Sequence, residues 1–338
     1  MSRRGVDAVP VDTTAAVLEA VGIEGHEITS RTSLAGGTYN TVTRVTLQDG
    51  SDWVVKVPPG HSTGMSYERR LLTNEVTFYE AASAHGVEAV PSVVHSELDP
   101  GAPAGAYVVM TARPGRPWHE IAGELTAGET AALRHEFGQI VGSLHDVTGK
   151  AGFGCPAEPL GPLTRTWREA FTAMTDAVLA DAERYGARLP HPVERIREML
   201  HSASGELDEV TRPALVHFDL WQGNLLVTGE PGARRIGGII DGERMFWGDP
   251  VADLVSTTLF GEPETDLDFL AGYASSARGP LDFTPSVRRR LNLYRSYLYL
   301  IMLTETVPRG AGPDARAWAW KEVAPRLVAA LEEVTRPR

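Results

Sequence analysis

The pattern of apolar and polar positions divides the chain into a first part rich in strands and a second part rich in helices. In the first part, apolar residues recur at helical spacing over residues 12–21 and 65–85. Five β-rich runs predict strands: 27–34, 41–47, 53–57, 92–98 and 106–111. The Asp49-Gly50 pair is a strong hairpin signal between the second and third strands.

The pattern changes to long helical spacings after Pro114, Gly115 and Pro117, which interrupt regular structure. Six later segments predict helices: 126–146, 163–186, 192–209, 265–277, 284–306 and 312–334. Three apolar runs that are too short for helices predict strands: 214–218, 224–228 and 236–241. The sequence thus predicts an α+β fold of two lobes. Residues 1–113 would form a small antiparallel sheet lobe, and residues 114–338 a larger helical lobe.

The composition of the 338 residues is that of a folded protein, because 42% of them are hydrophobic. The 32 Lys and Arg against 44 Asp and Glu give a net charge of -12, which argues against a nucleic-acid partner. The longest apolar run, residues 297–303, is far below the roughly 20 residues of a membrane span. One cysteine, Cys155, excludes an internal disulfide and fits a reducing compartment. We therefore expect a cytoplasmic monomer or homodimer without a membrane partner.

One polar loop carries the strongest chemical signal. Residues 217–224, between two predicted strands, have the pattern His-x-Asp-x-x-x-x-Asn. Phosphoryl transfer needs a base that accepts the proton of the attacking hydroxyl and ligands for the metal that neutralises the phosphates. Asp219 is the candidate base, and the amide oxygen of Asn224 is a candidate Mg²⁺ ligand. Asp241, at the end of the next predicted strand, can deliver a carboxylate to the same metal.

The first part of the chain offers groups for a nucleotide. Lys56 lies in an apolar strand, where a lone charge is costly without a partner. Glu75, on the apolar face of the helix predicted over residues 65–85, is the expected partner. Such a pair would direct the lysine ammonium toward nucleotide phosphates, as in kinases. Gly36 and Gly37 lie at a turn between strands, where the backbone can approach phosphates closely.

These positions resemble the aminoglycoside phosphotransferase family, a group of antibiotic and small-metabolite kinases related to protein kinases. The resemblance extends from about Leu34 to Leu254 and rests on the following parts: Gly36, Gly37, Lys56, Glu75, the linker after Met110, the 217–224 loop, Asp241 and the run 247–254. It implies a protein-kinase-like two-lobed fold. It also implies transfer from ATP or GTP, with Mg²⁺, to a small-molecule hydroxyl. By the same resemblance, the backbone from Thr111 to Arg113 holds the nucleobase.

The acceptor is expected beside Asp219 and opposite the nucleotide, because the attacking and leaving oxygens lie roughly in line. Four residues close to the motifs are candidate acceptor contacts: Trp221, Glu243, Arg244 and Trp247. The leading interpretation is phosphorylation of an antibiotic, conferring antibiotic resistance. The alternatives are a metabolic kinase for a sugar, choline-like or amino-alcohol substrate, and a catalytically inactive nucleotide-binding module. The net charge favours a cationic aminoglycoside or basic peptide, whereas the two tryptophans favour a nucleoside-type or sugar ligand.

Other polar residues near the motifs are better explained by structure than by chemistry. His217 is expected to anchor the loop, and His145, at a helix end, to be structural. Asp249 directly precedes Pro250, which is typical of a helix cap followed by proline at the first helical position. Asp253 is likewise expected to be structural.

Overall fold

The structure is a computed structural model that describes residues 13–34, 40–59, 64–157, 160–276 and 279–336. The chain divides into two compact units. The first comprises residues 1–60 and 92–112, and the second comprises residues 61–91 and 113–338. Gly36 and Gly37, predicted to approach phosphates, lie outside the described residues.

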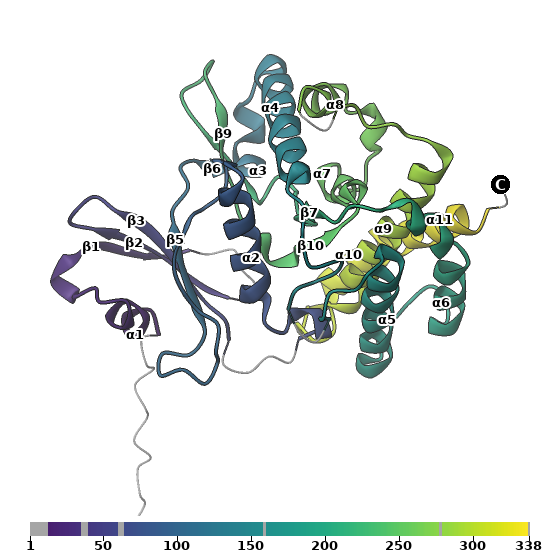
Figure 1. The fold of residues 1–338 in the computed structure, drawn as a ribbon, viewed down its shortest axis with the longest axis horizontal. Helices are drawn as coiled ribbons and strands as arrows, with labels where there is room; N and C mark the ends of the chain where they lie inside the picture. Colours follow the sequence, from purple (N-terminus) through teal and green to yellow (C-terminus); the bar gives the residue numbers. More distant parts are fainter. Residues whose placement is uncertain (1–12, 35–39, 60–63, 158–159, 277–278, 337–338) are drawn as a thin grey trace, which may run out of the picture. The chain divides into compact units, whose positions relative to one another are not determined.

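A five-stranded antiparallel sheet with the order β1-β2-β3-β5-β4 forms the first unit (Figure 1). Its strands are β1 (Ile28–Ser33), β2 (Thr41–Leu47), β3 (Asp52–Val57), β4 (Val93–Glu97) and β5 (Tyr107–Thr111). In the predicted β2–β3 hairpin, Gly50 has a φ of +87°, a left-handed conformation that glycine adopts without strain. Helix α1 (Thr13–Ala20) contributes Val17 and Leu18 to a core shared with Val45 and Val55 of the sheet.

Helices make up most of the second unit. The longer helices are α2 (Leu71–Ala84), α4 (Ala127–Asp146), α5 (Trp167–Tyr185), α6 (Val193–Ser202), α8 (Leu267–Ala274), α9 (Pro285–Thr304), α10 (Pro313–Glu322) and α11 (Ala324–Thr335). The helices α3 (Trp118–Ile121) and α7 (Leu254–Thr257) each have one turn. Helix α9 lies beside α5 and α11 (Figure 1) and buries Tyr294 and Tyr297. No helix among the described residues is long and apolar enough to cross a membrane.

Two small sheets carry the loops that the motifs occupy. One pairs β7 (Ala214–Val216) with β10 (Phe246–Gly248), and the other has the order β6-β8-β9. The strands of the second sheet are β6 (Arg116–Pro117), β8 (Leu225–Thr228) and β9 (Arg235–Ile239). The motif loop 217–224 connects β7 to β8, and Asp241 follows β9. Both candidate segments therefore leave the ends of short buried strands.

The predicted α+β fold class is confirmed, with a sheet unit and a helical unit. The helix predicted over 312–334 is two helices, because Pro325 lacks an N–H for a continuous helix. The segment predicted as one helix over 192–209 ends its α-helix at Ser202 and continues as the 3-10 helix η4 (Ser204–Glu209). The strands β6 and β10 are too short to produce a period in the sequence.

The segment 61–91, which the sequence assigns to the sheet lobe, belongs to the second unit in the structure. The physical reason is the close packing of α2 against the 3-10 helix η5 (Gly242–Arg244). A Cβ atom at Gly242 would lie 2.5 Å from Cδ1 of Phe78 on α2. Glycine at this position allows the backbone after Asp241 to approach α2 directly.

Two glycines allow α4 and α8 to meet backbone against backbone. A Cβ atom at Gly138 of α4 would lie 2.1 Å from the carbonyl oxygen of Phe269. A Cβ atom at Gly272 of α8 would lie 1.9 Å from the carbonyl oxygen of His135. Backbone atoms cannot swing aside as the end of a side chain can, so a methyl group at either position would separate the helices.

We predict that Gly272→Ala lowers the free energy of unfolding by about 1–3 kcal/mol, the usual cost of overpacking a core. Gly128→Ala, in the first turn of α4, is the matched control because a Cβ atom there would meet nothing within 4 Å. The control is expected to be neutral or to stabilise the protein by about 0.4–1 kcal/mol. Urea unfolding followed by circular dichroism measures both changes. Equal midpoints for the two variants would contradict the close approach.

Candidate active site

The loop 217–224 is held by one buried carboxylate. Asp253 is fully buried and accepts hydrogen bonds from the backbone N–H groups of His217 (3.1 Å) and Phe218 (2.6 Å). Phe218 has a φ of +65°, which is strained for a bulky residue, and its side chain is buried. The two hydrogen bonds compensate for this strain and fix the direction in which the chain enters Asp219.

A second set of buried groups holds Asp253 in turn. His145 at the end of α4 contacts Oδ2 of Asp253 through Nε2 at 2.9 Å. Its other ring nitrogen, Nδ1, contacts the hydroxyl of Tyr273 on α8 at 2.9 Å. All three side chains are buried among the helices. The arrangement agrees with the structural roles expected for His145 and Asp253.

Both ring nitrogens of His217 are used within the loop. Nδ1 accepts a hydrogen bond from the backbone N–H of Asp219 at 3.2 Å. Nε2 therefore carries the ring proton and donates a hydrogen bond to the carbonyl oxygen of Ile240 at 3.0 Å. His217 thus connects the loop to the strand end that precedes Asp241, which supports its expected anchoring role.

Asp219 and Asn224 contact each other across the loop. The Nδ2 of Asn224 donates hydrogen bonds to the backbone oxygen of Asp219 (2.8 Å) and to its Oδ2 (3.2 Å). The amide oxygen of Asn224 points away from these contacts, as a metal ligand would require. Burial raises the pKa of Asp219 above its ordinary value, and the nearby Arg244 guanidinium partly opposes that effect. The arrangement places the candidate base and the candidate neutral oxygen ligand side by side.

Asp241 leaves β9 in a left-handed conformation with a φ of +66°. Its backbone N–H donates to the hydroxyl of Tyr79 at 2.9 Å, and that hydroxyl donates to Oε1 of Glu75 at 3.0 Å. The backbone N–H of Ile240 donates to the carbonyl oxygen of Asn224 at 3.0 Å, so the segments of both candidate metal ligands are adjacent.

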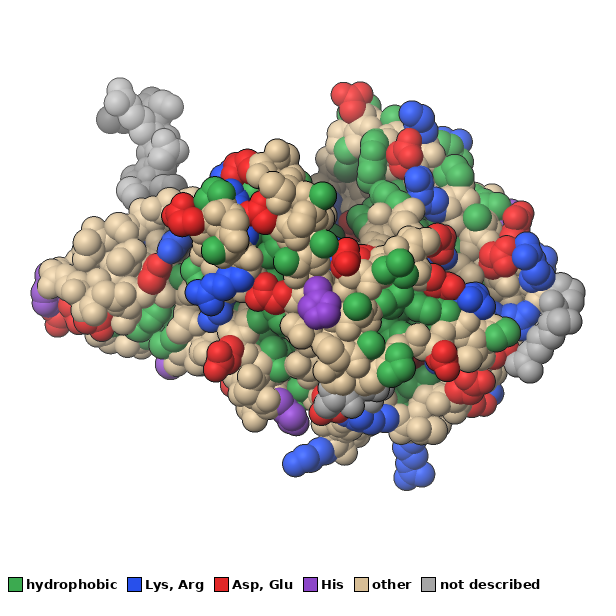
Figure 2. Space-filling model, turned by 90° about the horizontal axis from the view of Figure 1, so that it is seen from above, with side chains coloured by type: hydrophobic (Ala, Val, Ile, Leu, Met, Phe, Trp, Pro, Cys, Tyr) green, Lys and Arg blue, Asp and Glu red, His purple; other side chains and the backbone are tan. Residues whose placement is uncertain are grey.

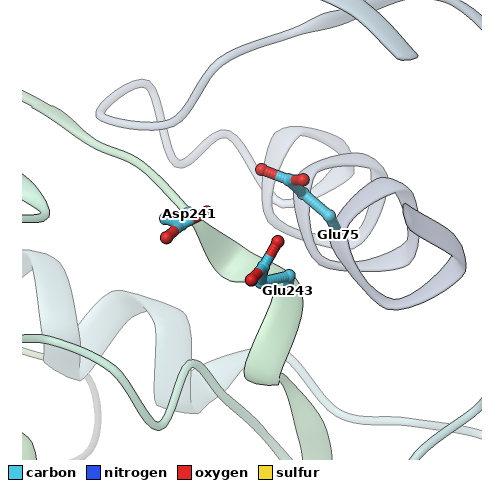
Figure 3. Close-up of side chains that lie close together, drawn as sticks. All are labelled: Glu75, Asp241 and Glu243. Atoms are coloured by element: carbon cyan, nitrogen blue, oxygen red, sulfur yellow. The ribbon is translucent and has the colours of Figure 1, made fainter. Parts of the chain in front are cut away.

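Three carboxylates converge between α2 and the turn that follows β9. Glu75 points from α2 toward Asp241 and Glu243 (Figure 3), and one oxygen of each residue lies within 4.8 Å of the others. Carboxylate and amide oxygens are the ligands that Mg²⁺ prefers in proteins. Negative charge concentrated in this way fits a divalent cation.

The predicted acceptor residues occupy different environments. Trp221 is 40% exposed, and its ring lies 5.4 Å from that of His119. It borders an open cleft of about 390 Å³ lined by His119, Trp221, Gln222, Ser256, Thr257, Thr258, Leu259 and Gly261. Trp247 is buried in β10, and its ring packs against Gly149. Arg244 lies beside Asp219, with its Nε 4.0 Å from Oδ2.

The residues predicted to contact the nucleotide belong to both units. Lys56 is buried on β3 of the first unit, whereas Glu75 belongs to the second, so their pairing stays a prediction. Thr111 ends β5, and its hydroxyl accepts a hydrogen bond from the backbone N–H of Ser92 at 2.9 Å. Arg113 donates from Nε to the carbonyl oxygen of Gly237 at 3.0 Å. Their predicted contact with a nucleobase likewise stays a prediction.

Sequence reasoning did not find His119 or Glu305 as parts of this region. His119 follows the lobe boundary and meets Trp221 only through folding. Glu305 pairs with Arg244 at 3.2 Å, although 61 positions separate them. Neither residue belongs to a local motif.

Cys155 is buried as an ordinary core residue, and this burial raises its pKa to about 12.

The candidate base and candidate metal ligands leave adjacent strand ends within a two-unit α+β fold, the arrangement that a kinase-like phosphotransferase would need. The chain belongs to the phosphotransferase enzyme family, whose profile it matches over residues 30–291. This membership confirms the family resemblance and the predicted class of enzyme.

The names of individual relatives are more specific than the description of the family. A "Probable ketoamine kinase" of Synechocystis sp. is 31% identical over 176 residues, which are 48% of this chain and 53% of that protein. The chain thus spans about half the length of this curated relative. A "putative fructosamine-3-kinase" from Thermobifida fusca has a TM-score of 0.65 at 20% identity, covering 96% of this chain and 100% of that one. A thermostable mutant of aminoglycoside phosphotransferase APH(4)-Ia, in complex with AMP-PNP and hygromycin B, has a TM-score of 0.61 at 17% identity, covering 94% and 97%. The two structures show the fold alone.

We predict that Asp241→Ala reduces turnover and raises the Mg²⁺ concentration needed for half-maximal rate, because a charged ligand is lost. Asn224→Ala should have the same effects to a smaller extent, since a neutral amide compensates less charge. Initial rates across a Mg²⁺ titration, with Asp268→Ala on the exposed face of α8 as control, measure the change. Wild-type rates for Asp241→Ala at every Mg²⁺ concentration would place the metal elsewhere.

Proposed function

We propose that the protein is a metabolic small-molecule kinase that transfers a phosphoryl group from ATP or GTP to a hydroxyl group of a ketoamine, a sugar derivative that carries an amine substituent. The observation that carries the phosphotransfer is the convergence of Asp219, Asn224 and Asp241 on adjacent strand ends. The ketoamine is supported by the names of the curated relatives, two more of which are also probable ketoamine kinases.

The comparisons favour the metabolic alternative over the antibiotic interpretation that the sequence put first. The aminoglycoside phosphotransferases resemble the chain in fold at low identity, whereas the curated sequence relatives carry the ketoamine kinase name. The cleft beside Trp221 supports the same choice, because none of its eight lining residues is acidic. A polycationic aminoglycoside would need several carboxylates in its binding site, whereas a ketoamine has one amine and needs mainly hydroxyl groups and an aromatic face.

The described residues suggest a direct transfer. The acceptor hydroxyl oxygen attacks the terminal phosphorus, its bond to that phosphorus forms, and the bond to the leaving nucleoside diphosphate breaks. Asp219 accepts the hydroxyl proton. Asn224 and Asp241 would hold Mg²⁺, which neutralises charge on the phosphates when it is bound with the nucleotide. Lys56 would support the phosphates from the sheet unit.

One face of the surface shows a mixed pattern of charge. On the face drawn in Figure 2, acidic and basic side chains are interspersed over the surface. The net charge of -12 is therefore not gathered there into one patch. The expected cytoplasmic location and the monomeric or homodimeric state stay predictions.

A panel of acceptors tests the proposal, with phosphate transfer from ATP measured for a ketoamine such as fructosylglycine, a free sugar, choline and hygromycin B. We expect the highest kcat/KM for the ketoamine. Asp219→Asn should reduce its turnover by about 10²–10⁴-fold while nucleotide binding persists, because the base addresses the acceptor. Asp208→Asn, on an exposed carboxylate, is the matched control. Preference for hygromycin B would restore the antibiotic interpretation, and nucleotide binding without any transfer would indicate an inactive module.

We predict that Trp221→Ala raises the acceptor KM by about tenfold and leaves the nucleotide KM within about twofold, since a lost stacking contact costs about 1–2 kcal/mol. Trp318→Ala removes a similarly exposed tryptophan from α10 and serves as control. Steady-state kinetics for both substrates are paired with melting temperatures. Equal losses for both substrates, together with a lower melting temperature, would make Trp221 a packing residue.

A further inference from the structure

We propose that Arg244 is a positioning residue for Asp219: its guanidinium holds one carboxylate oxygen, Oδ2, and thereby directs the other oxygen, Oδ1, toward the acceptor hydroxyl. This inference rests on the proposed phosphotransfer and assigns Arg244 a role different from the acceptor contact expected from the sequence. It is carried by the position of Arg244 between two partly buried carboxylates, those of Asp219 and Glu305.

Both contacts to the Asp219 carboxylate are made to the same oxygen. Nε of Arg244 lies 4.0 Å from Oδ2, and Nδ2 of Asn224 lies 3.2 Å from it. Oδ1 has no hydrogen bond to any described side chain near the loop. One hydrogen bond from Asn224 and the positive charge of Arg244 at 4.0 Å both attract Oδ2, which favours one orientation of the carboxylate and leaves Oδ1 free to face the acceptor.

The arginine is itself fixed on its other side. Its Nη2 donates to Oε2 of Glu305 at 3.2 Å, at the C-terminal end of α9. The guanidinium carbon lies 5.7 Å from the ring centroid of Tyr67, and the hydroxyl of Tyr67 donates to the same Oε2 at 3.2 Å. The arginine side chain is only 14% exposed. Because the guanidinium is a rigid plane, fixing Nη2 also fixes where Nε points.

Glu305 is held by a second arginine. Nη1 of Arg309 lies 3.3 Å from Oε2 of Glu305, and Nε of Arg309 donates to Oε1 of Glu68 at 2.9 Å. Charges of opposite sign therefore alternate from Glu68 through Arg309, Glu305 and Arg244 to Asp219. Without Arg244, Asp219 and Glu305 would be two like charges in one poorly solvated region, and their repulsion would turn the base away.

Three variants separate positioning from general stability. Arg244→Met keeps the length of the side chain without its charge, Arg244→Lys keeps a charge but not the planar fork, and Arg290→Met is the matched control. Arg290 is a buried arginine whose Nε and Nη1 pair with Asp249 at 2.8 Å and Glu209 at 2.7 Å. It has no contact with the loop 217–224 among the described residues.

We expect Arg244→Met to lower kcat by about 10²-fold, the usual effect of displacing a catalytic group by about 1 Å. Both KM values should stay within about twofold, and Arg244→Lys should recover about tenfold of the lost kcat. Arg290→Met should lower the melting temperature without a comparable loss of kcat. Kinetics are measured well below the melting temperature of each variant, with the acceptor that the wild-type protein uses best.

Several results would overturn the proposal. Equal losses of kcat in Arg244→Met and Arg290→Met would make Arg244 a stabilising residue only. A rise in acceptor KM with unchanged kcat would make it an acceptor contact. If Arg244→Met does not fold, Arg244→Lys decides, because wild-type kcat in that variant would contradict the need for a planar fork. Absence of transfer by the wild-type protein would refute the proposed function, whereas wild-type transfer with insensitive variants would refute the role of Arg244 alone.

Discussion

The candidate site depends on the buried carboxylate of Asp253. Its two oxygens bind consecutive backbone N–H groups, those of His217 and Phe218, and so hold Phe218 in a conformation that its side chain disfavours. A buried charge of this kind is costly unless it is fully hydrogen-bonded, and His145 supplies the remaining contact. The strain is thus maintained by groups from three separate segments. The path of the backbone into Asp219 depends on these hydrogen bonds.

How much the sequence could predict depends on how far apart along the chain the interacting residues lie. Asp219 and Asn224 were found because five positions of one loop bring them together, and Asp241 was found because a short apolar strand ends there. The strands of the sheet unit were found because residues that favour strands are concentrated in five short runs. The pairing of Arg244 with Glu305 joins two segments with no shared motif, and only the packing of α9 brings them together. The packing of α2 in the helical unit depends on Gly242, because any side chain at this position would collide with Phe78 on α2.

The chemistry of transfer and the choice of acceptor are encoded in different ways. Transfer needs a few oxygen atoms at fixed positions, so residue types at fixed spacing reveal it. In the proposed function the acceptor would be chosen by the walls of the cleft beside Trp221, which include residues 221–222, 256–259 and 261. Net charge describes the whole surface and not those walls, and for this reason the value of -12 pointed toward cationic antibiotics. The cleft itself is lined by aromatic, hydroxyl and amide groups.

The burial of Cys155 has a practical consequence for measuring motion between the two units. Since the only thiol of the chain is enclosed in the core and its pKa is raised to about 12, it is poorly reactive toward maleimides at neutral pH. Two cysteines introduced at exposed positions would then be labelled without first removing the native thiol. One dye on the β2–β3 hairpin and another on α10 would report the separation of the units by energy transfer. The same pair of dyes could follow that separation as nucleotide is added.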